Sequence, residues 1–140
     1  MTVMALDPGS KRIGLAVSDP RGSFALPLEP IRVRADGGHL GELTRAAAER
    51  RAERVLVGLP LRLDGTEGPA ARKARDFAAA VGRATSLPVE LVDERLTTVQ
   101  AERELIGRGV RREHRRARID SAAAALLLQA WLDAHREAGE

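Results

Sequence analysis

Acidic side chains occur at three points of the sequence where an enzyme could use them. Asp7 ends the first apolar run of the chain, and Asp93 and Glu94 end the run that follows Pro88. Asp120 lies near the start of an apolar C-terminal segment. A carboxylate beside apolar residues costs desolvation free energy, which a bound divalent cation compensates. Because oxygen ligands without His or Cys favour Mg²⁺ or Mn²⁺ over zinc, these acids are candidate ligands of Mg²⁺ or Mn²⁺.

Each acid also has a purely structural explanation. The sequence Asp7-Pro8-Gly9 has turn composition, because Asp favours the first turn position, Pro presets the second and Gly supplies a positive φ at the third. A second copy, Asp19-Pro20-Arg21-Gly22, follows the next apolar run, and we interpret it only as a turn. Asp93, Glu94 and Asp120 can equally interact with helix N-termini. Taken singly, the acids leave both explanations open.

The spacing of apolar residues and helix breakers predicts the elements that position these acids. We expect strands over 2–6, 13–18, 26–33, 55–58 and 89–92, and helices over 40–54, 70–84 and 118–135. A further helix begins at Thr97, which has capping-box spacing to Gln100, and ends at Gly107 and Gly109. Pro27 and Pro30 favour an edge or a bulged position for the third strand. The order predicts an α/β layered fold with an antiparallel start and parallel additions, in which sites gather at the carboxyl ends of strands.

Composition limits the class of protein. A chain of 140 residues with 44% hydrophobic and 31% charged residues predicts one domain over residues 1–140. The absence of cysteine excludes disulfides, thiolate catalysis and cysteine zinc sites. The longest apolar run, 122–128, is too short for a membrane span, and the N-terminus lacks a signal-peptide pattern. We therefore expect a cytoplasmic protein with no membrane partner.

The basic residues are concentrated and are mostly arginine, which gives a sequence pI of about 10.4 at a net charge of +3. The segment 103–118 is the densest, and we predict that four of its arginines form a mobile element that binds the phosphates of nucleic acid: Arg111, Arg112, Arg115 and Arg116. The alternative is an ordinary solvated face. Phe24, Phe77 and Trp131 all have apolar neighbours that indicate core positions, so stacking platforms for single strands are few. Recognition of structured RNA or branched DNA by backbone and shape fits better.

Four segments of the sequence resemble the signature blocks of the YqgF/RuvX family. They are LDPGSKRIGLAVSD, VGLPLRLDGTEGPAARKARDF, LVDERLTTVQAE and IDSAAAALLLQAWLD, and they occur in order over nearly the whole chain. Members of this family are described as Holliday junction resolvases or as pre-16S rRNA nucleases. The resemblance implies an RNase H-like fold with a five-stranded mixed sheet flanked by helices.

The resemblance also implies roles for individual residues. Asp7, Glu94 and Asp120 match the metal-binding acids, and two ions held there would orient water for attack on a phosphodiester. Gly9 would let the backbone approach the phosphate closely. Lys11 and Arg95 are candidates for phosphate contact or ordinary surface cations.

One departure from the related RuvC type concerns the fourth strand. That type carries a Glu where this chain has Gly58, so Glu94 or Asp64 must replace it. Asp93 competes with Glu94, but neighbours on an extended strand point in opposite directions, and we choose Glu94.

The favoured hypothesis is a metal-dependent nuclease that acts on pre-16S rRNA or on Holliday junctions. One alternative is a non-catalytic module that binds nucleic acid through its arginines. A second alternative is an ATPase or sugar-kinase-like domain, because such enzymes also bind phosphate at an Asp-x-Gly turn before a hairpin. It is less favoured, since those enzymes clamp nucleotide between two domains and this chain supplies one. A resolvase would act as a homodimer, since symmetrical nicks need two active sites.

Overall fold

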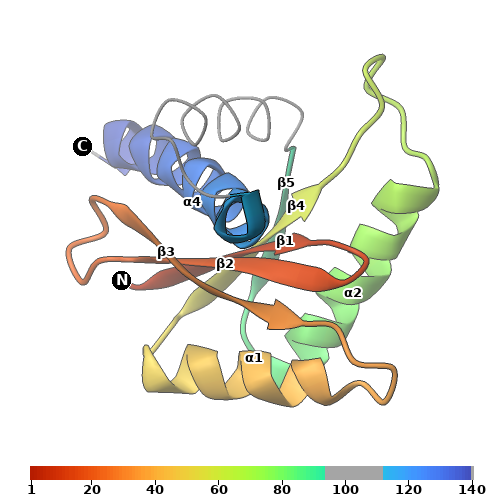
Figure 1. Ribbon diagram of the computed structural model, residues 1–140. Coiled ribbons are helices and arrows are strands. Elements are labelled where there is room, and N and C mark those ends of the chain that lie inside the picture. The colour runs from red at the N-terminus through yellow and green to blue at the C-terminus, as the bar shows by residue number, and fades with distance from the viewer. Residues whose placement is uncertain (94–111, 140) are drawn as a thin grey trace.

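The described part of the chain, residues 1–93 and 112–139 of the computed structural model, follows the predicted order of elements (Figure 1). Its strands are β1 (Val3–Pro8), β2 (Arg12–Ser18), β3 (Ala25–Arg32), β4 (Arg54–Leu59) and β5 (Val89–Asp93). The helices in this part are α1 (Gly38–Glu49), α2 (Pro69–Thr85) and α4 (Arg112–Gly139). The helix predicted from Thr97 to Gly109 lies outside the described residues.

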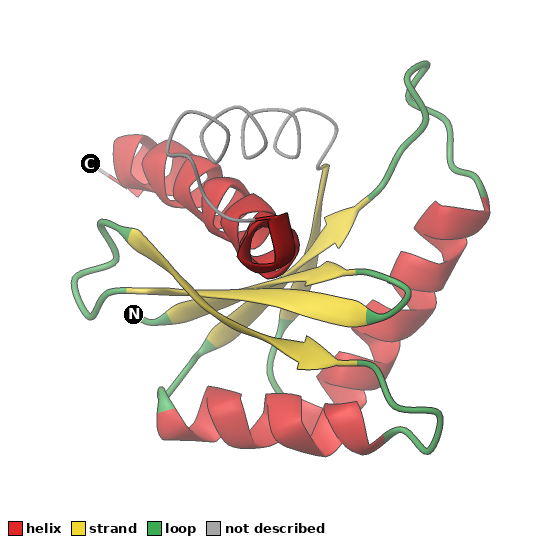
Figure 2. Cartoon of the chain, viewed as in Figure 1, coloured by secondary structure: helices red, strands yellow, loops and turns green. Residues whose placement is uncertain are grey.

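The five strands form one mixed sheet in the order β3-β2-β1-β4-β5 (Figure 2). Strands β1, β2 and β3 pair antiparallel, whereas β1, β4 and β5 pair parallel. The predicted antiparallel start and parallel additions are thus confirmed. Strand β1 lies between the antiparallel strand β2 and the parallel strand β4, so a residue at its carboxyl end has a neighbour on each of these two strands.

Helices cover both faces of the sheet, with α4 on one side and α1 and α2 on the other (Figure 1). Along β1, Val3 and Ala5 pack in the cluster that contains Leu127 and Leu128 of α4, on what we call the α4 face. Met4 and Leu6 pack in the cluster of α1 and α2, on the α1/α2 face. Since side chains of a strand alternate between faces, burial on both faces explains why this run is uninterruptedly apolar.

Strand β3 is an edge strand, as its prolines predict. Its pairing with β2 shifts between Ile13 and Leu15, which is the signature of a bulge. The prediction that Phe24 belongs to the core is wrong, because this side chain is 66% exposed just before β3. Apolar neighbours in the sequence do not reveal that the hairpin end projects beyond the layers. Phe77 is half-buried and Trp131 is buried, as predicted.

Helix α1 ends several residues before the predicted end at 54. Arg51 adopts a left-handed φ of 56°, and its N–H donates to the Ala48 carbonyl at 3.1 Å. The Ala52 N–H donates to the Ala47 carbonyl at 2.9 Å. These two bonds close a helix terminus of the type that usually has Gly at the left-handed position. Because an arginine occupies it here, composition gave no stop signal.

Helix α4 begins at Arg112, so the predicted start at 118 is wrong. Between Val110 and Ala138 the sequence contains no Gly or Pro, and Arg, Glu and Ala are good helix formers. The main chain of Arg112, Arg115 and Arg116 is therefore helical instead of forming a loop before the helix. Among the described helices, none combines the length and apolar character needed to cross a membrane.

Candidate active site

The carboxyl ends of the parallel strands β1, β4 and β5 meet along one border of the sheet, which we call the carboxyl edge. Leu6 of β1 pairs with Val57 of β4, and Leu59 of β4 pairs with Asp93 of β5. Asp7, one residue beyond Leu6, therefore reaches the same edge as Asp93. In sheets with parallel strands, ligands bind at this edge, so the predicted convergence of these two strand ends is confirmed.

Asp7 and Asp19 share the Asp-Pro sequence but differ in setting. Oδ1 of Asp19 accepts hydrogen bonds from the backbone N–H of Ser23 at 2.7 Å and of Phe24 at 2.9 Å. The bond from Phe24 is the main cause that lowers the pKa of Asp19 below its ordinary value. Asp7 instead lies within β1, half-buried and paired with Gly14, and the turn begins after it. Turn chemistry therefore explains Asp19, whereas Asp7 lies in a strand and precedes its turn.

The turn between β1 and β2 uses Gly9 in a way that the sequence did not predict. Its φ is not positive, unlike that of Gly22, whose φ is 71° in the second copy. The Gly9 N–H donates to the Arg12 carbonyl at 3.0 Å, and a Cβ at Gly9 would lie 2.6 Å from that carbonyl oxygen. The constraint on Gly9 is close packing of main chain against main chain.

The alternation of side chains separates the acids of the carboxyl edge. Asp7 follows Ala5 by two residues and so lies on the α4 face. On β5, Val92 packs on the α4 face and Leu91 packs on the α1/α2 face. Asp93, two residues after Leu91, therefore belongs to the α1/α2 face. Asp7 and Asp93 reach one edge but lie on opposite faces of the sheet.

Strand β4, between β1 and β5, presents glycine on the α4 face at this edge. Leu56 packs on the α4 face, so Gly58 lies on that face too, and it pairs with Val92. Asp7 follows the pair formed by Leu6 and Val57, which places it beside Gly58. No carboxylate of β4 thus stands next to Asp7, in agreement with the sequence.

Helix α4 is fixed to the sheet by Ser121. Its buried hydroxyl accepts a hydrogen bond from the Leu15 N–H at 3.4 Å and donates to the Leu28 carbonyl at 2.5 Å. The hydroxyl therefore bridges β2 and β3 beside the bulge. Leu15 pairs with Leu6, and the next pair toward the carboxyl edge is Asp7 with Gly14. The α4 main chain at Ser121 thus lies above the strand pair adjacent to Asp7.

The far end of α4 lies at the opposite border of the sheet. The Gln129 side chain accepts from the Ala25 N–H and donates to the Ser23 carbonyl, both at 2.9 Å. Trp131 Nε1 donates to Glu90 Oε2 at 2.9 Å near the start of β5. The helix therefore runs from the carboxyl edge to the other border, and the main chain of Asp120, directly before Ser121, is near the edge where Asp7 lies.

Replacing Ser121 by Ala is expected to lower the free energy of unfolding by about 1–3 kcal/mol, because the buried Leu15 N–H and Leu28 carbonyl lose their partner. Urea denaturation followed by circular dichroism measures this loss. Ser10→Ala is the control, since Ser10 is exposed. Equal stability of the two variants would contradict the bridging role of Ser121.

Several predicted residues cannot be placed. Glu94, Arg95 and Arg111 lie outside the described residues, and the side chains of four more are not described: Arg112, Arg115, Arg116 and Asp120. Within the part of the chain that is described with side chains, no three acids or histidines gather into a metal-ligand cluster.

Asp64 is engaged in the loop that joins β4 to α2. Its Oδ1 accepts hydrogen bonds from Thr66 Oγ1 at 2.6 Å and from the Thr66 N–H at 3.0 Å. The Thr66 side-chain bond is the main cause that lowers the pKa of Asp64 below its ordinary value. Asp64 thus has a structural role at an exposed loop tip.

The lowered pKa of Asp64 gives a pH prediction. A depressed carboxyl pKa in the folded state adds stability above the unfolded-state pKa, and that stability is lost as pH falls through the folded-state value. A carbon-13 NMR titration is expected to give Asp64 a midpoint below that of an unstructured Asp. Thr66→Ala is expected to raise the midpoint, whereas Thr44→Ala, which removes a hydroxyl from α1, is not. An unchanged midpoint in Thr66→Ala would contradict the assigned cause.

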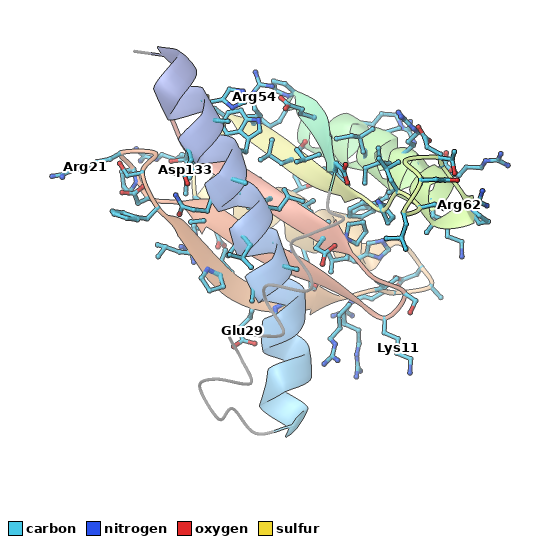
Figure 3. The ribbon with its side chains drawn as sticks, turned by 90° about the horizontal axis from the view of Figure 1, so that it is seen from above. Lys11, Arg21, Glu29, Arg54, Arg62 and Asp133 are labelled. Atoms are coloured by element: carbon cyan, nitrogen blue, oxygen red, sulfur yellow. The ribbon has the colours of Figure 1, made fainter. Side chains whose placement is uncertain are left out.

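Lys11 is exposed on the turn after β1 and projects from the same end of the molecule as Arg62 (Figure 3). Sequence reasoning overlooked two cations beside it, Arg12 and Arg32, which are register partners across β2 and β3. The proximity of Arg12 to Lys11 was readable from the sequence. The proximity of Arg32 to Lys11 depends on the register between β2 and β3, which the bulge shifts.

The comparison with known families then identifies the chain. The family described as "RuvX: Holliday junction resolvase" matches residues 1–134. The chain belongs to the RuvX family. A relative of this RuvX chain from Kineococcus radiotolerans, named "Putative pre-16S rRNA nuclease", is 49% identical over 137 residues, covering 95% of this chain and 72% of the relative. A relative of the same name from Myxococcus xanthus is 45% identical over 136 residues, covering 97% of this chain and 90% of the relative.

Solved structures show the same fold. RuvC from Thermus thermophilus, in complex with a Holliday junction substrate, superimposes with a TM-score of 0.60 at 22% identity over 98% of this RuvX chain and 96% of RuvC. The fowlpox virus resolvase, in complex with Holliday junction DNA, gives a TM-score of 0.57 at 8% identity over 96% of this chain and 99% of the resolvase. These structures confirm the predicted RNase H-like fold, and the match over residues 1–134 confirms the predicted family.

Proposed function

We propose that this chain is a nuclease that uses divalent metal ions to hydrolyse phosphodiester bonds in structured nucleic acid. The observation that carries the proposal is the setting of Asp7. It is a half-buried carboxylate at the carboxyl edge, on the α4 face, and it lies within β1, before the turn begins. Family membership and the printed names of the relatives support the same reaction class.

We propose Asp7, Glu94 and Asp120 as the metal-binding and catalytic acids. Asp7 and the main chain of Asp120 lie at one edge and on one face of the sheet. Period-two alternation assigns Asp93 to the other face, and this favours its neighbour Glu94 as the acid contributed by the β5 end. Gly58 of β4 supplies no side chain between the two strands, which favours β5 as the source of the third carboxylate.

The donor set fits magnesium or manganese. The acids proposed are carboxylate oxygen donors, which suit hard divalent cations. Bound there, such ions would activate water and stabilise the departing oxygen of the phosphodiester. The chain itself holds Asp7 on a central strand. The hydrogen bonds of Ser121 to β2 and β3 fix the rotation of α4 about its own axis. Lys11 and Arg95 are proposed to contact substrate phosphates.

The substrate is proposed to be either the 5′ end of pre-16S rRNA or a Holliday junction. The names of the relatives favour rRNA, and the family description favours the junction. We propose that Arg111, Arg112, Arg115 and Arg116 add phosphate contacts, for which charge reversal would weaken binding and flatten its salt dependence. A homodimer and a cytoplasmic location stay predictions.

The deciding experiment offers both substrates to the same protein. A labelled four-way DNA junction and an RNA with an extended pre-16S 5′ end are incubated with the chain in Mg²⁺, in Mn²⁺ and in EDTA. Cleavage of one substrate, dependent on metal, supports the proposal and selects the substrate. Binding without cleavage of either would instead support a non-catalytic nucleic-acid-binding module.

A further inference from the structure

A hollow of about 520 Å³ lies on the α1/α2 face just below the carboxyl edge, and we call it the central hollow. Its volume falls in the range of small-molecule sites. The walls are largely apolar and come from four elements and the turns between them; among them are Pro8, Ile13, Pro60, Pro69, Ala70 and Phe77. Polar atoms are few, which makes the hollow suited to a flat apolar group with polar edges.

The central hollow adjoins the candidate active site through the main chain. Pro8 in its wall directly follows Asp7, and Pro60 directly follows Leu59, the last residue of β4. Asp7 lies on the α4 face and the hollow on the α1/α2 face. A group bound near Asp7 and a group in the hollow would therefore be separated by the end of β1.

Two hollows rich in cations flank the central hollow and share wall residues with it. The first, of about 430 Å³, shares Ser10 and contains three cations and no acid: Lys11, Arg12 and Arg32. The second, of about 330 Å³, shares Lys73 with the central hollow, and its wall also contains Arg62 and Arg72. The apolar central hollow therefore lies between two cationic hollows, and we call the three adjoining hollows the trough. Figure 3 shows Lys11 and Arg62 at the same end of the molecule.

The acids of the second flanking hollow leave its positive character in place. Glu67 pairs with Arg75, whose Nη2 lies 2.6 Å from Glu67 Oε2, and this pairing lowers the pKa of Glu67. Asp76 is the other acid of the lining. Against these, Arg62, Arg72 and Lys73 contribute three positive charges.

We propose that the central hollow receives one unstacked nucleobase of the substrate while the adjoining phosphates lie in the two cationic hollows. A nucleic-acid strand alternates anionic phosphates with bases that have apolar faces and polar edges, and the trough has the same order of charge. The inference rests on the proposed function and adds that the substrate exposes at least one unpaired nucleotide beside the cleaved bond.

Polar groups in the central hollow can bind the edge of the base. His39 Nδ1 accepts a hydrogen bond from the Arg34 N–H at 3.1 Å. In the neutral ring that bond requires the tautomer with the proton on Nε2, which is then the available donor. The Ser10 hydroxyl and the Lys73 ammonium are the other polar groups of the wall that could reach a base. Phe77 is the aromatic side chain of the wall, and contact with it would favour binding of a base.

A substitution can fill the hollow without entering the core. Ala70 lines the hollow and is exposed in the first turn of α2, so Ala70→Trp is expected to occupy the volume and leave the fold intact. Ala79→Trp is the matched control, because Ala79 is exposed on the same helix and does not line the hollow.

The test measures binding and needs no cleavage. A trinucleotide with a central adenine, and the same trinucleotide with an abasic centre, are titrated into nitrogen-15-labelled protein and followed by NMR. We expect amide shifts at Gly9, Ala70 and Ala74, and affinity weaker by about tenfold or more for the abasic probe and for Ala70→Trp. Ala79→Trp is expected to bind like the wild type.

Three results would overturn the inference: equal affinity for the two probes, unchanged affinity in Ala70→Trp, or shifts confined to residues outside the trough. If the chain cleaves neither substrate but these binding differences appear, the proposed nuclease activity fails and the base site stands. If it cleaves while the differences are absent, the base site fails alone.

Discussion

Asp7→Asn is expected to reduce the rate of cleavage by more than about 100-fold, since loss of residues that merely support a metal ligand already costs 10–100-fold. Asn keeps the size of the side chain and one oxygen but removes the charge that would hold divalent cations. Single-turnover cleavage in saturating Mg²⁺ measures the loss. Gel-shift binding of the same substrate is expected to stay near the wild-type level, because Asp7 contributes no positive charge to substrate binding.

The chain contains its own control for this substitution. Asp19→Asn changes the same residue type before the same Pro, at the hairpin between β2 and β3, where the carboxylate serves only a turn. Its cleavage rate is expected to match the wild type. Cleavage by Asp7→Asn at the wild-type rate would show that the nuclease proposal is wrong, whereas equal losses in both variants would point to damaged folding.

The second large effect separates two neighbouring acids. Glu94→Gln is expected to lower cleavage by more than about 100-fold, whereas Asp93→Asn is expected to cleave at nearly the wild-type rate. The reason is the alternation along β5, where Val92 packs on the α4 face that carries Asp7 and Leu91 packs on the other. Measuring the Mg²⁺ concentration for half-maximal cleavage in both variants tests metal binding as well as rate.

The reverse outcome would have a clear meaning. If Asp93→Asn were inactive and Glu94→Gln active, side-chain alternation along β5 would not identify the metal-binding acid. Asp93 would then replace Glu94 in the proposal. Activity in both variants would exclude the end of β5 as a source of ligands. Circular dichroism spectra of both proteins verify that the fold is unchanged.

The strands β1, β2 and β4 were predictable from the sequence because each is a short apolar run that ends at a turn or at proline. Leu59-Pro60 ends β4 as expected, and Pro27 and Pro30 correctly indicated an edge strand. Parallel pairing also predicted correctly that the ends of β1 and β5 reach the same edge of the sheet. These features depend on local composition and on one general rule of sheet topology.

Other features depend on contacts that no local pattern encodes. Arg51 ends α1 in a conformation usual for glycine, and Phe24 is exposed although its neighbours are apolar. Arg32 joins Arg12 only through strand register, and the central hollow is assembled from segments distant in sequence. The turn after Asp7 has the composition of its second copy but a different geometry, so composition alone could not distinguish Asp19, which caps a turn, from Asp7, the proposed catalytic aspartate.

The hydroxyl of Ser121 sits between two strands, and this has a consequence for how α4 tolerates changes in length. One amino acid inserted between Asp120 and Ser121 would preserve the helix but turn Asp120 by about 100° around its axis. Extra turns added upstream of Asp120 would leave its direction unaltered. Under the proposed role of Asp120, the beginning of α4 can therefore vary in length, whereas the spacing between Asp120 and Ser121 has to be kept.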